Sequence, residues 1–293
     1  MKRARQIATA GMAISAGLAA MKLTFGWMAH SAALTADGFE SAADVFASGV
    51  VLAGLIVASR PADDNHPYGH GRVETLAGLW VGFMLFGAGL LIAWHGLTGS
   101  AEAGQPPHHY AIWPLLISIA VKLAFVGVKR REGKRIGSAA LVADAAHDSI
   151  DILSGIVALG ALSLALYDPA RFLRADHIGA FGVGLIVLVT AVRVMRDASL
   201  HLMDTMPDDS ALAEIRSVAL RVPQVSGVEK CYARKTGLRY HVDLHLEVDP
   251  QMTVRASHDI ATHVRDRIRE ELPWVADVLV HVEPWPGPSP PPV

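Results

Sequence analysis

Six long apolar segments, separated by short polar connectors, occupy this 293-residue sequence up to about Asp197. A helix that crosses a bilayer needs about 20 mostly apolar residues, and each segment is long enough. Charged residues make up only 18% of the chain, whereas soluble domains usually carry about 25%. The sequence therefore predicts an α-helical membrane protein with six transmembrane helices: Ile7–His30, Ala33–Ser59, Thr75–Leu97, Tyr110–Val128, Gly137–Leu166 and Ile178–Met195.

Other classes of protein fit this composition poorly. High apolar content with a net charge of only −2 argues against disorder, and a pI near 6.7 gives no support for a nucleic-acid partner. The single cysteine, Cys231, excludes a disulfide framework and a cysteine-rich zinc module. The first apolar run follows basic residues like a signal peptide, but Lys22 interrupts it and no polar mature domain follows.

The basic residues between the predicted helices indicate the orientation. Cytoplasmic loops of membrane proteins carry an excess of lysine and arginine. With a cytoplasmic N-terminus, the outside loops hold only Arg171 and Arg174. We therefore expect a multi-pass protein of the cell membrane, in contact with the lipid bilayer, with both termini cytoplasmic. The basic residues that this orientation assigns to the inside loops are Lys2, Arg3, Arg5, Arg60, Arg72, Lys129, Arg130, Arg131, Lys134, Arg135, Arg193 and Arg196.

The sequence after Met206 has ordinary mixed composition and predicts a small soluble domain. We divide the chain into a transmembrane domain at 1–206, a cytoplasmic domain at 207–284 and a Pro-rich tail at 285–293. A helix is expected from Asp209 or Ser210 to Leu220, and another over Thr253–Leu272. Apolar and polar residues alternate over Tyr240–Val248 and again over Val278–Val282, as in half-buried strands. The order helix, two strands, helix, strand predicts one sheet covered by helices.

The second and fifth predicted helices share a sequence pattern. Residues 33–44 and 140–151 both read Ala-Leu-x-Ala-Asp-x-x-(Glu or His)-x-x-x-Asp. These two helices run in opposite directions across the bilayer. Such an inverted repeat is typical of transporters whose binding sites lie near the midplane of the membrane.

The repeated pattern places paired metal-ligating residues on each helix. Residues i and i+4 share a helix face, so Glu40 lies beside Asp44 and His147 beside Asp151. Three carboxylates and an imidazole suit Zn²⁺ or a related divalent ion. The alternative is that they only form hydrogen bonds between helices, but buried carboxylates without a cation are costly in a bilayer. Asp37 and Asp144, one turn earlier, are predicted to support the ligands, to give protons access, or to be only structural.

At these residues the sequence resembles the cation diffusion facilitators, proton-coupled exporters of divalent metals. The resemblance covers nearly the whole chain and includes the segments His66–Glu74 and Val280–Pro284. It implies a homodimer with six transmembrane helices per protomer, a cytoplasmic ferredoxin-like domain, and transport through the ligands on the second and fifth helices. Glu40 departs from the family, which usually has His, Asp or Asn there. Zn²⁺ remains our first prediction, and Fe²⁺, Co²⁺, Cd²⁺ and Mn²⁺ stay open.

The resemblance also implies two further metal sites and an ion pair. The connector after the second helix carries Asp63, His66 and His70, which match a cytoplasm-facing site in some members, although the spacing alone equally fits a solvated loop. Residues at positions of a binuclear site at the dimer interface are His245, His258, His281 and Glu283, with Glu229 where some relatives have His. His241 and Asp243 share the strand face of His245, and a solvated sheet face is the alternative. Relatives place an ion pair at the positions of Arg72 and Asp204.

The predicted function is proton-coupled efflux of divalent metal ions by alternating access, with the ions as substrate and as regulatory ligands. The alternative is a membrane metal sensor or scaffold that does not transport. An enzyme is not expected, since the chain has no His-Glu-x-x-His helix, Gly-rich phosphate loop or Gly-x-Ser-x-Gly elbow. A channel is a further alternative, but fixed ligand sites suit exchange better than fast conduction.

Overall fold

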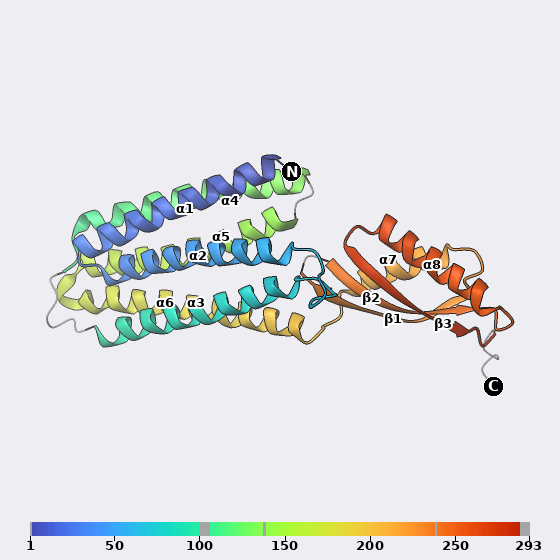
Figure 1. Cartoon of the computed structure of the whole chain (residues 1–293). Coiled ribbons are helices and arrows are strands. Elements are labelled where there is room, and N and C mark those ends of the chain that lie inside the picture. Colours follow the sequence, from blue (N-terminus) through green and yellow to red (C-terminus); the bar gives the residue numbers. More distant parts are fainter. Residues whose placement is uncertain (1, 100–105, 137–138, 238, 288–293) are drawn as a thin grey trace, which may run out of the picture. The chain divides into compact units, whose positions relative to one another are not determined.

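A computed structural model describes residues 2–99, 106–136, 139–237 and 239–287 (Figure 1). The contacts divide the chain into two compact units, Met1–Leu52 with Gly78–Met195, and Ala53–Ala77 with Arg196–Val293. Each unit combines two separate stretches of the sequence, so the units do not test the predicted domain boundary at residue 206. That boundary remains a prediction. The long helices are α1 (Lys2–Met28), α2 (Ala32–Ala58), α3 (Arg72–Thr98), α4 (Ile112–Ile136), α5 (Ala139–Tyr167) and α6 (Pro169–Leu202).

Each predicted membrane span corresponds to one of these helices. Five, from α2 to α6, are long and apolar enough to cross a membrane. The first predicted span is also helical, as α1, but it is not among those five. The helical membrane fold is therefore confirmed. The side chains of Lys2, Arg3 and Arg5, the predicted helix start at Gly137, and the end of the tail after Gly287 lie outside the described residues.

The basic stretch after Val128 differs from its prediction as a connector. It is helical, because α4 continues through it to Ile136. A short 3-10 turn at His109–Ala111 comes directly before α4. Lysine and arginine are good helix formers, so a helix can continue through them beyond an apolar run. Lys129 is predicted to lie in an inside loop, but it is 3% exposed within α4 and pairs with Asp148 on α5.

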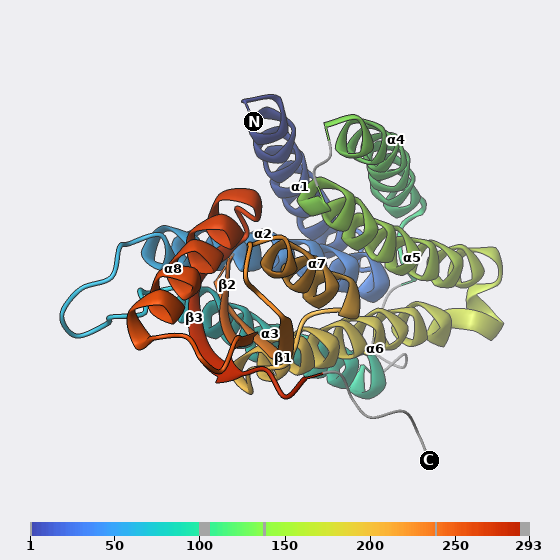
Figure 2. The same cartoon turned by 90° about the vertical axis from the view of Figure 1, so that its right-hand side faces the viewer.

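Helix α4 packs beside α1 and α5 (Figure 2). The start of α2 is held by a carboxylate from α6: Asp176 accepts hydrogen bonds from the backbone N–H of Ala32 at 2.5 Å and from the hydroxyl of Ser31 at 2.8 Å. The first N–H groups of a helix have no partner within the helix, and this carboxylate supplies one. Asp176 thereby fixes where α2, which carries Glu40 and Asp44, begins.

The second unit contains a three-stranded sheet covered on one face by two helices (Figure 1). Its elements are α7 (Asp209–Leu220), β1 (Gly227–Thr236), β2 (Arg239–Val248), α8 (Val254–Glu271) and β3 (Val275–Pro284). Strands β1 and β2 are antiparallel, and β2 and β3 are parallel. Parallel neighbours need a crossover connection, which α8 provides. The predicted element order and the small α+β domain are confirmed.

The alternation in β2 separates the two faces of the sheet. Val242, Leu244 and Leu246 are at most 1% exposed and pack in one core with Ile215 of α7 and Ile268 of α8. Successive side chains of a strand point to opposite faces. The histidines and carboxylates between these apolar residues therefore lie on the face that the helices leave open.

The connector between α2 and α3 contacts the β1–β2 turn within the second unit. A Cβ atom added at Gly71 would lie 2.7 Å from the backbone oxygen of Thr236. Gly237, in the turn, has a φ of +66°, a conformation that glycine adopts without steric cost. The absence of side chains at both glycines lets the two backbones approach closely.

Candidate metal centre

Three of the four residues predicted on the repeated pattern converge in the structure. One ligand atom from each of Asp44, His147 and Asp151 lies within 4.8 Å of the others. Asp44 comes from α2, whereas His147 and Asp151 are one turn apart on α5. Nε2 of His147 is 3.7 Å from Oδ1 of Asp44. We call these three residues the helix cluster.

Glu40 lies one turn before Asp44 on α2, outside the helix cluster. Its side chain is buried, and its Oε2 has no hydrogen-bond partner in the described part of the chain. Oδ2 of Asp44 is likewise buried without one. Unpaired buried carboxylate oxygens are costly, so this region fits a bound cation. Two carboxylates and an imidazole, with a third carboxylate nearby, supply oxygen and nitrogen donors suited to a divalent transition metal.

Three buried lysines pair with carboxylates on α2 and α5, and the sequence analysis did not assign them this role. Nζ of Lys22 on α1 is 2.7 Å from Asp37, and Nζ of Lys129 on α4 is 2.5 Å from Asp148. Nζ of Lys122, also on α4, is 2.7 Å from Oδ2 of Asp151. A signal was present, because ionisable residues within apolar spans are rare and usually functional. The lysine pairings are the clearest feature that sequence reasoning missed.

Asp37 and Asp144 were predicted to support the ligands. Asp37 is 1% exposed and its partner is Lys22, so it lies outside the helix cluster. The side chain of Asp144 is outside the described residues. The supporting role of both residues stays a prediction.

The connector after α2 brings together the three residues predicted there. Nδ1 of His66 is 2.9 Å, and Nε2 of His70 3.4 Å, from the carboxylate of Asp63. We call these residues the loop cluster; their ligand atoms lie within 4.8 Å of one another. Asp63 is exposed, and its hydrogen bond with His66 lowers the pKa of the Asp63 carboxyl. This carboxylate therefore remains ionised below the ordinary range of aspartate and is available to a cation.

A third group of predicted ligands lies on the open face of the sheet. The parallel register sets His245 of β2 opposite His281 of β3. Nδ1 of His245 is 2.5 Å, and Nε2 of His281 3.6 Å, from Oε1 of Glu283. Hydrogen bonds with Glu229 and then with His245 lower the pKa of Glu283. We call His245, His281 and Glu283 the sheet cluster.

His258, predicted with this group, is not brought to the sheet cluster within the described chain. It is exposed on α8, and α8 packs against the other face of the sheet. Its role as a ligand stays a prediction. The predicted ion pair of Arg72 with Asp204 is present at 2.9 Å, with both side chains exposed.

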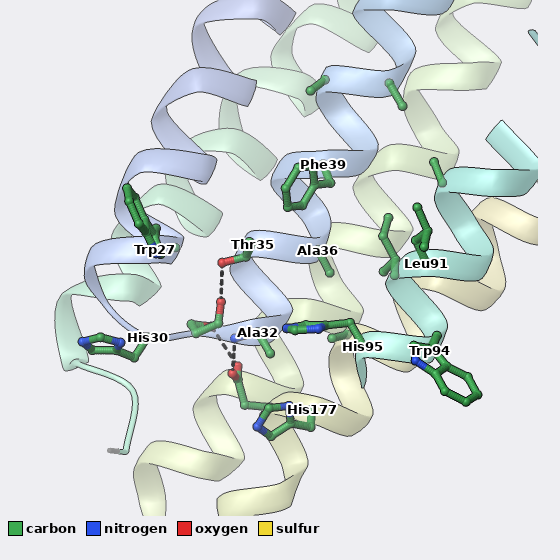
Figure 3. Close-up of a pocket in the computed structure, with 18 of the residues that line it drawn as sticks. Trp27, His30, Ala32, Thr35, Ala36, Phe39, Leu91, Trp94, His95 and His177 are labelled. Carbon is green, nitrogen blue, oxygen red and sulfur yellow. Dashed lines mark hydrogen bonds between the residues drawn. The ribbon is translucent and has the colours of Figure 1, made fainter. Parts of the chain in front are cut away.

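An apolar cavity of about 1210 Å³ lies among α1, α2, α3 and α6 (Figure 3). Phe39 and Leu91 line its walls, and His95 and His177 lie at the end where α1 meets α2. Ser31 and Asp176, which are joined by a hydrogen bond from the Ser31 hydroxyl, also line the cavity. Neither Glu40 nor any helix-cluster residue lines this cavity, so it is separate from the candidate metal centre.

Comparison with known proteins places most of the chain in one family. Residues 8–203 match the cation efflux transmembrane domain, and residues 207–285 match the cytoplasmic domain of cation efflux proteins. The manganese efflux system protein MneP of Bacillus subtilis is 30% identical, over 96% of this chain and 96% of its own. The cation-efflux pump FieF of Pectobacterium atrosepticum is 31% identical, over 94% and 91%.

A plant relative is longer than this chain. Metal tolerance protein C1 of Arabidopsis thaliana is 31% identical over 94% of this chain, which spans 61% of the plant protein. The two domain matches together cover most of the sequence, in the order in which the helices and the sheet domain occur. This chain, a multi-pass membrane protein and not an enzyme, therefore belongs to the cation efflux family of divalent-metal transporters.

Proposed function

We propose that this protein exports divalent transition-metal ions from the cytoplasm in exchange for protons, with Zn²⁺ as its principal substrate. The observation that carries the proposal is the helix cluster, in which Asp44, His147 and Asp151 converge from two helices of the apolar bundle. The unpaired oxygens of Asp44 and Glu40 favour a cation there. Metal binds to the deprotonated cluster from the cytoplasm, and a shift between two packings of the helices then exposes the site to the other side.

Exchange with protons follows from the chemistry of the ligands. Carboxylate and imidazole must be deprotonated to bind a metal, so metal and protons exclude each other. An imidazole gains a proton more readily near neutral pH than a carboxylate does. We assign His147 as the ligand through which external protons compete with the metal and release it.

The donor atoms of the helix cluster and of Glu40 favour two candidate metals for different reasons. The imidazole of His147 favours Zn²⁺, whereas the carboxylates of Asp44 and Asp151, with Glu40 close by, also suit the harder Mn²⁺. A relative named as a manganese efflux protein supports Mn²⁺ as the second candidate. The same donor atoms can also bind Fe²⁺, Co²⁺ and Cd²⁺, but they select for these ions less strongly than for Zn²⁺ or Mn²⁺.

The remaining predictions concern assembly and regulation. We propose a homodimer in the cell membrane with both termini in the cytoplasm, in which the loop and sheet clusters bind metal from the cytoplasm. Metal on the sheet cluster would favour one arrangement of the two copies, because a ligand shifts an equilibrium toward the state that it binds more tightly. We also propose His258 as a ligand of the metal site at the interface between the two copies.

The test is metal uptake into proteoliposomes with an imposed pH gradient, comparing wild type with Asp151→Ala. We expect Zn²⁺ flux that requires both the gradient and Asp151, and competition experiments with Mn²⁺, Fe²⁺, Co²⁺ and Cd²⁺ give the order of preference. Flux that is independent of the gradient would refute proton coupling but not transport. No flux for any metal, together with metal bound to the purified protein, would favour a sensor or scaffold.

A further inference from the structure

Asp151 of the helix cluster makes a contact that is not part of metal binding. Nζ of Lys122 is 2.7 Å from Oδ2 of Asp151, and the two side chains are 7% and 8% exposed. The same contact is a hydrogen bond from the ammonium group to the carboxylate. A lysine ammonium has donors but no acceptor, so it cannot bind a metal in this form. One oxygen of a cluster ligand is thus engaged by a fixed positive charge.

Within the described residues, three buried lysine–carboxylate pairs connect α1 and α4 to α2 and α5, and one of these three includes a helix-cluster residue. Lys22 pairs with Asp37, and Lys129 pairs with Asp148. Neither Asp37 nor Asp148 is in the helix cluster. All three pairs are buried, and their nitrogen–oxygen distances are 2.5–2.7 Å, so the chain itself offers controls for the Lys122–Asp151 pair.

We propose that Lys122 is a tethered cation that holds Asp151 when no metal is bound and that an incoming divalent ion displaces. This inference rests on the proposed transport through the helix cluster and names a residue that sets its affinity. Lys122 is a positioning residue, because it acts on the metal through Asp151. The ammonium and the metal compete for the same carboxylate.

The physical argument concerns the charge of the empty site. An ionised carboxylate without a partner is strongly unfavourable in an apolar interior, and the Lys122 ammonium removes this penalty for Asp151. A metal ion binds a carboxylate oxygen at about 2.0–2.2 Å. The nearby ammonium must then move away or repel the metal at close range, where Coulomb energies in protein are large. Lys122 therefore stabilises the empty state and weakens metal binding.

Weaker binding serves a transporter, which must release its substrate as well as bind it. Replacing Lys122 by an uncharged residue removes the competitor and the repulsion together. Metal affinity should then increase, while the release of metal and the return of the empty site should slow down. A residue that only supported the packing of α4 against α5 would have the opposite effect on affinity.

The experiment measures Zn²⁺ and Mn²⁺ binding by calorimetry on the full-length purified protein and flux in proteoliposomes. Binding that disappears in Asp151→Ala is assigned to the helix cluster. For Lys122→Met we expect a Kd about tenfold lower, equivalent to about 1.4 kcal/mol, together with a lower KM and a lower maximal rate of transport. Lys122→Arg, which keeps the charge, should keep the wild-type Kd. Lys129→Met, the matched control, should not tighten binding.

Lys122→Gln guards against a variant that fails to fold, since it keeps a hydrogen-bond donor and loses only the charge. Folding is checked by thermal unfolding, and affinity also by the metal-induced rise in Tm. An unchanged or higher Kd in a folded uncharged variant overturns the role of Lys122, as does equal tightening in Lys129→Met. If wild type transports and depends on Asp151, such a result refutes this inference alone. Wild-type binding that is unaffected by Asp151→Ala refutes the proposed site itself.

Discussion

The helix cluster and the loop cluster contain the same kinds of side chain, but they are built in different ways. Asp44, His147 and Asp151 come from two helices far apart in the sequence, whereas Asp63, His66 and His70 lie on one short connector. In the helix cluster Asp151 is buried and pairs with a lysine; in the loop cluster Asp63 is exposed and its partners are the histidines themselves. Similar ligands thus meet different energetic conditions.

This difference teaches how burial changes the role of a carboxylate. In the apolar bundle an ionised oxygen needs a positive partner, and the chain supplies lysines from α1 and α4. On the exposed connector water stabilises the charge, and the hydrogen bond with His66 is sufficient to lower the pKa of Asp63. The helix cluster should therefore control transport, whereas the loop cluster should only adjust it.

The largest expected effect separates the two clusters by transport rate. Replacing an outer partner of a metal ligand typically costs about 10–100-fold in affinity or activity, and Asp44→Asn removes a proposed ligand itself. We expect its flux in proteoliposomes to fall by about 100-fold or more. Asp63→Asn should reduce flux by only a few-fold. Asp148→Asn, a buried carboxylate on α5 outside the helix cluster, is the matched control, and equal losses in Asp44→Asn and Asp63→Asn would contradict the comparison.

The next effect concerns stability, because buried and exposed ion pairs should differ. Lys22 and Asp37 are each 1% exposed, whereas Arg72 and Asp204 are 54% and 42% exposed. Breaking a buried pair costs about 3–5 kcal/mol, and an exposed pair contributes about 0–1 kcal/mol. Thermal unfolding in detergent should therefore show a large loss of stability for Asp37→Asn and little change for Asp204→Asn.

A double replacement controls this stability measurement. Lys22→Met combined with Asp37→Leu removes both charges and should recover most of the stability lost in Asp37→Asn, since apolar residues often replace a buried pair without cost. A double variant as unstable as the single one would show that the charges are not the cause. Equal destabilisation by Asp37→Asn and Asp204→Asn would remove the contrast between the regions.

The smallest effect is the pH dependence of the loop cluster. The folded pKa of Asp63 lies below its ordinary value because of the hydrogen bond with His66. Its contribution to stability is therefore complete above the ordinary aspartate pKa and is lost as the pH falls through the lowered folded pKa. NMR titration of the Asp63 carboxyl should show a rise in pKa in His66→Ala. An unchanged pKa would assign the shift to another group.

Several features of the fold could be predicted from sequence because they depend on neighbouring residues. Apolar runs of sufficient length predicted the helices, and period-two alternation predicted β2 and β3. The spacing of His147 and Asp151 placed them on one face of α5. The basic residues after Val128 are the exception, because their charge predicts a connector, whereas lysine and arginine also favour helix.

The arrangement of the candidate metal centre could be predicted only in part. The repeated pattern predicted that Asp44, His147 and Asp151 lie together, and they do converge. The same pattern predicted Glu40 as a fourth member, but Glu40 lies outside the helix cluster. The pattern also did not predict that Lys122 pairs with Asp151. A sequence pattern fixes which residues share a face of one helix, but not how far that helix is rotated or shifted against the next.

The sequence by itself determined the number and order of the main elements, the apolar bundle, the open and covered faces of the sheet, and the candidate ligands within each helix or strand. These follow from chain periodicity and from the cost of placing polar groups in lipid. Only the tertiary structure decided which lysine neutralises which carboxylate, and that His245 faces His281 across β2 and β3. Such pairings depend on how whole elements pack, because the atoms that meet are far apart along the chain.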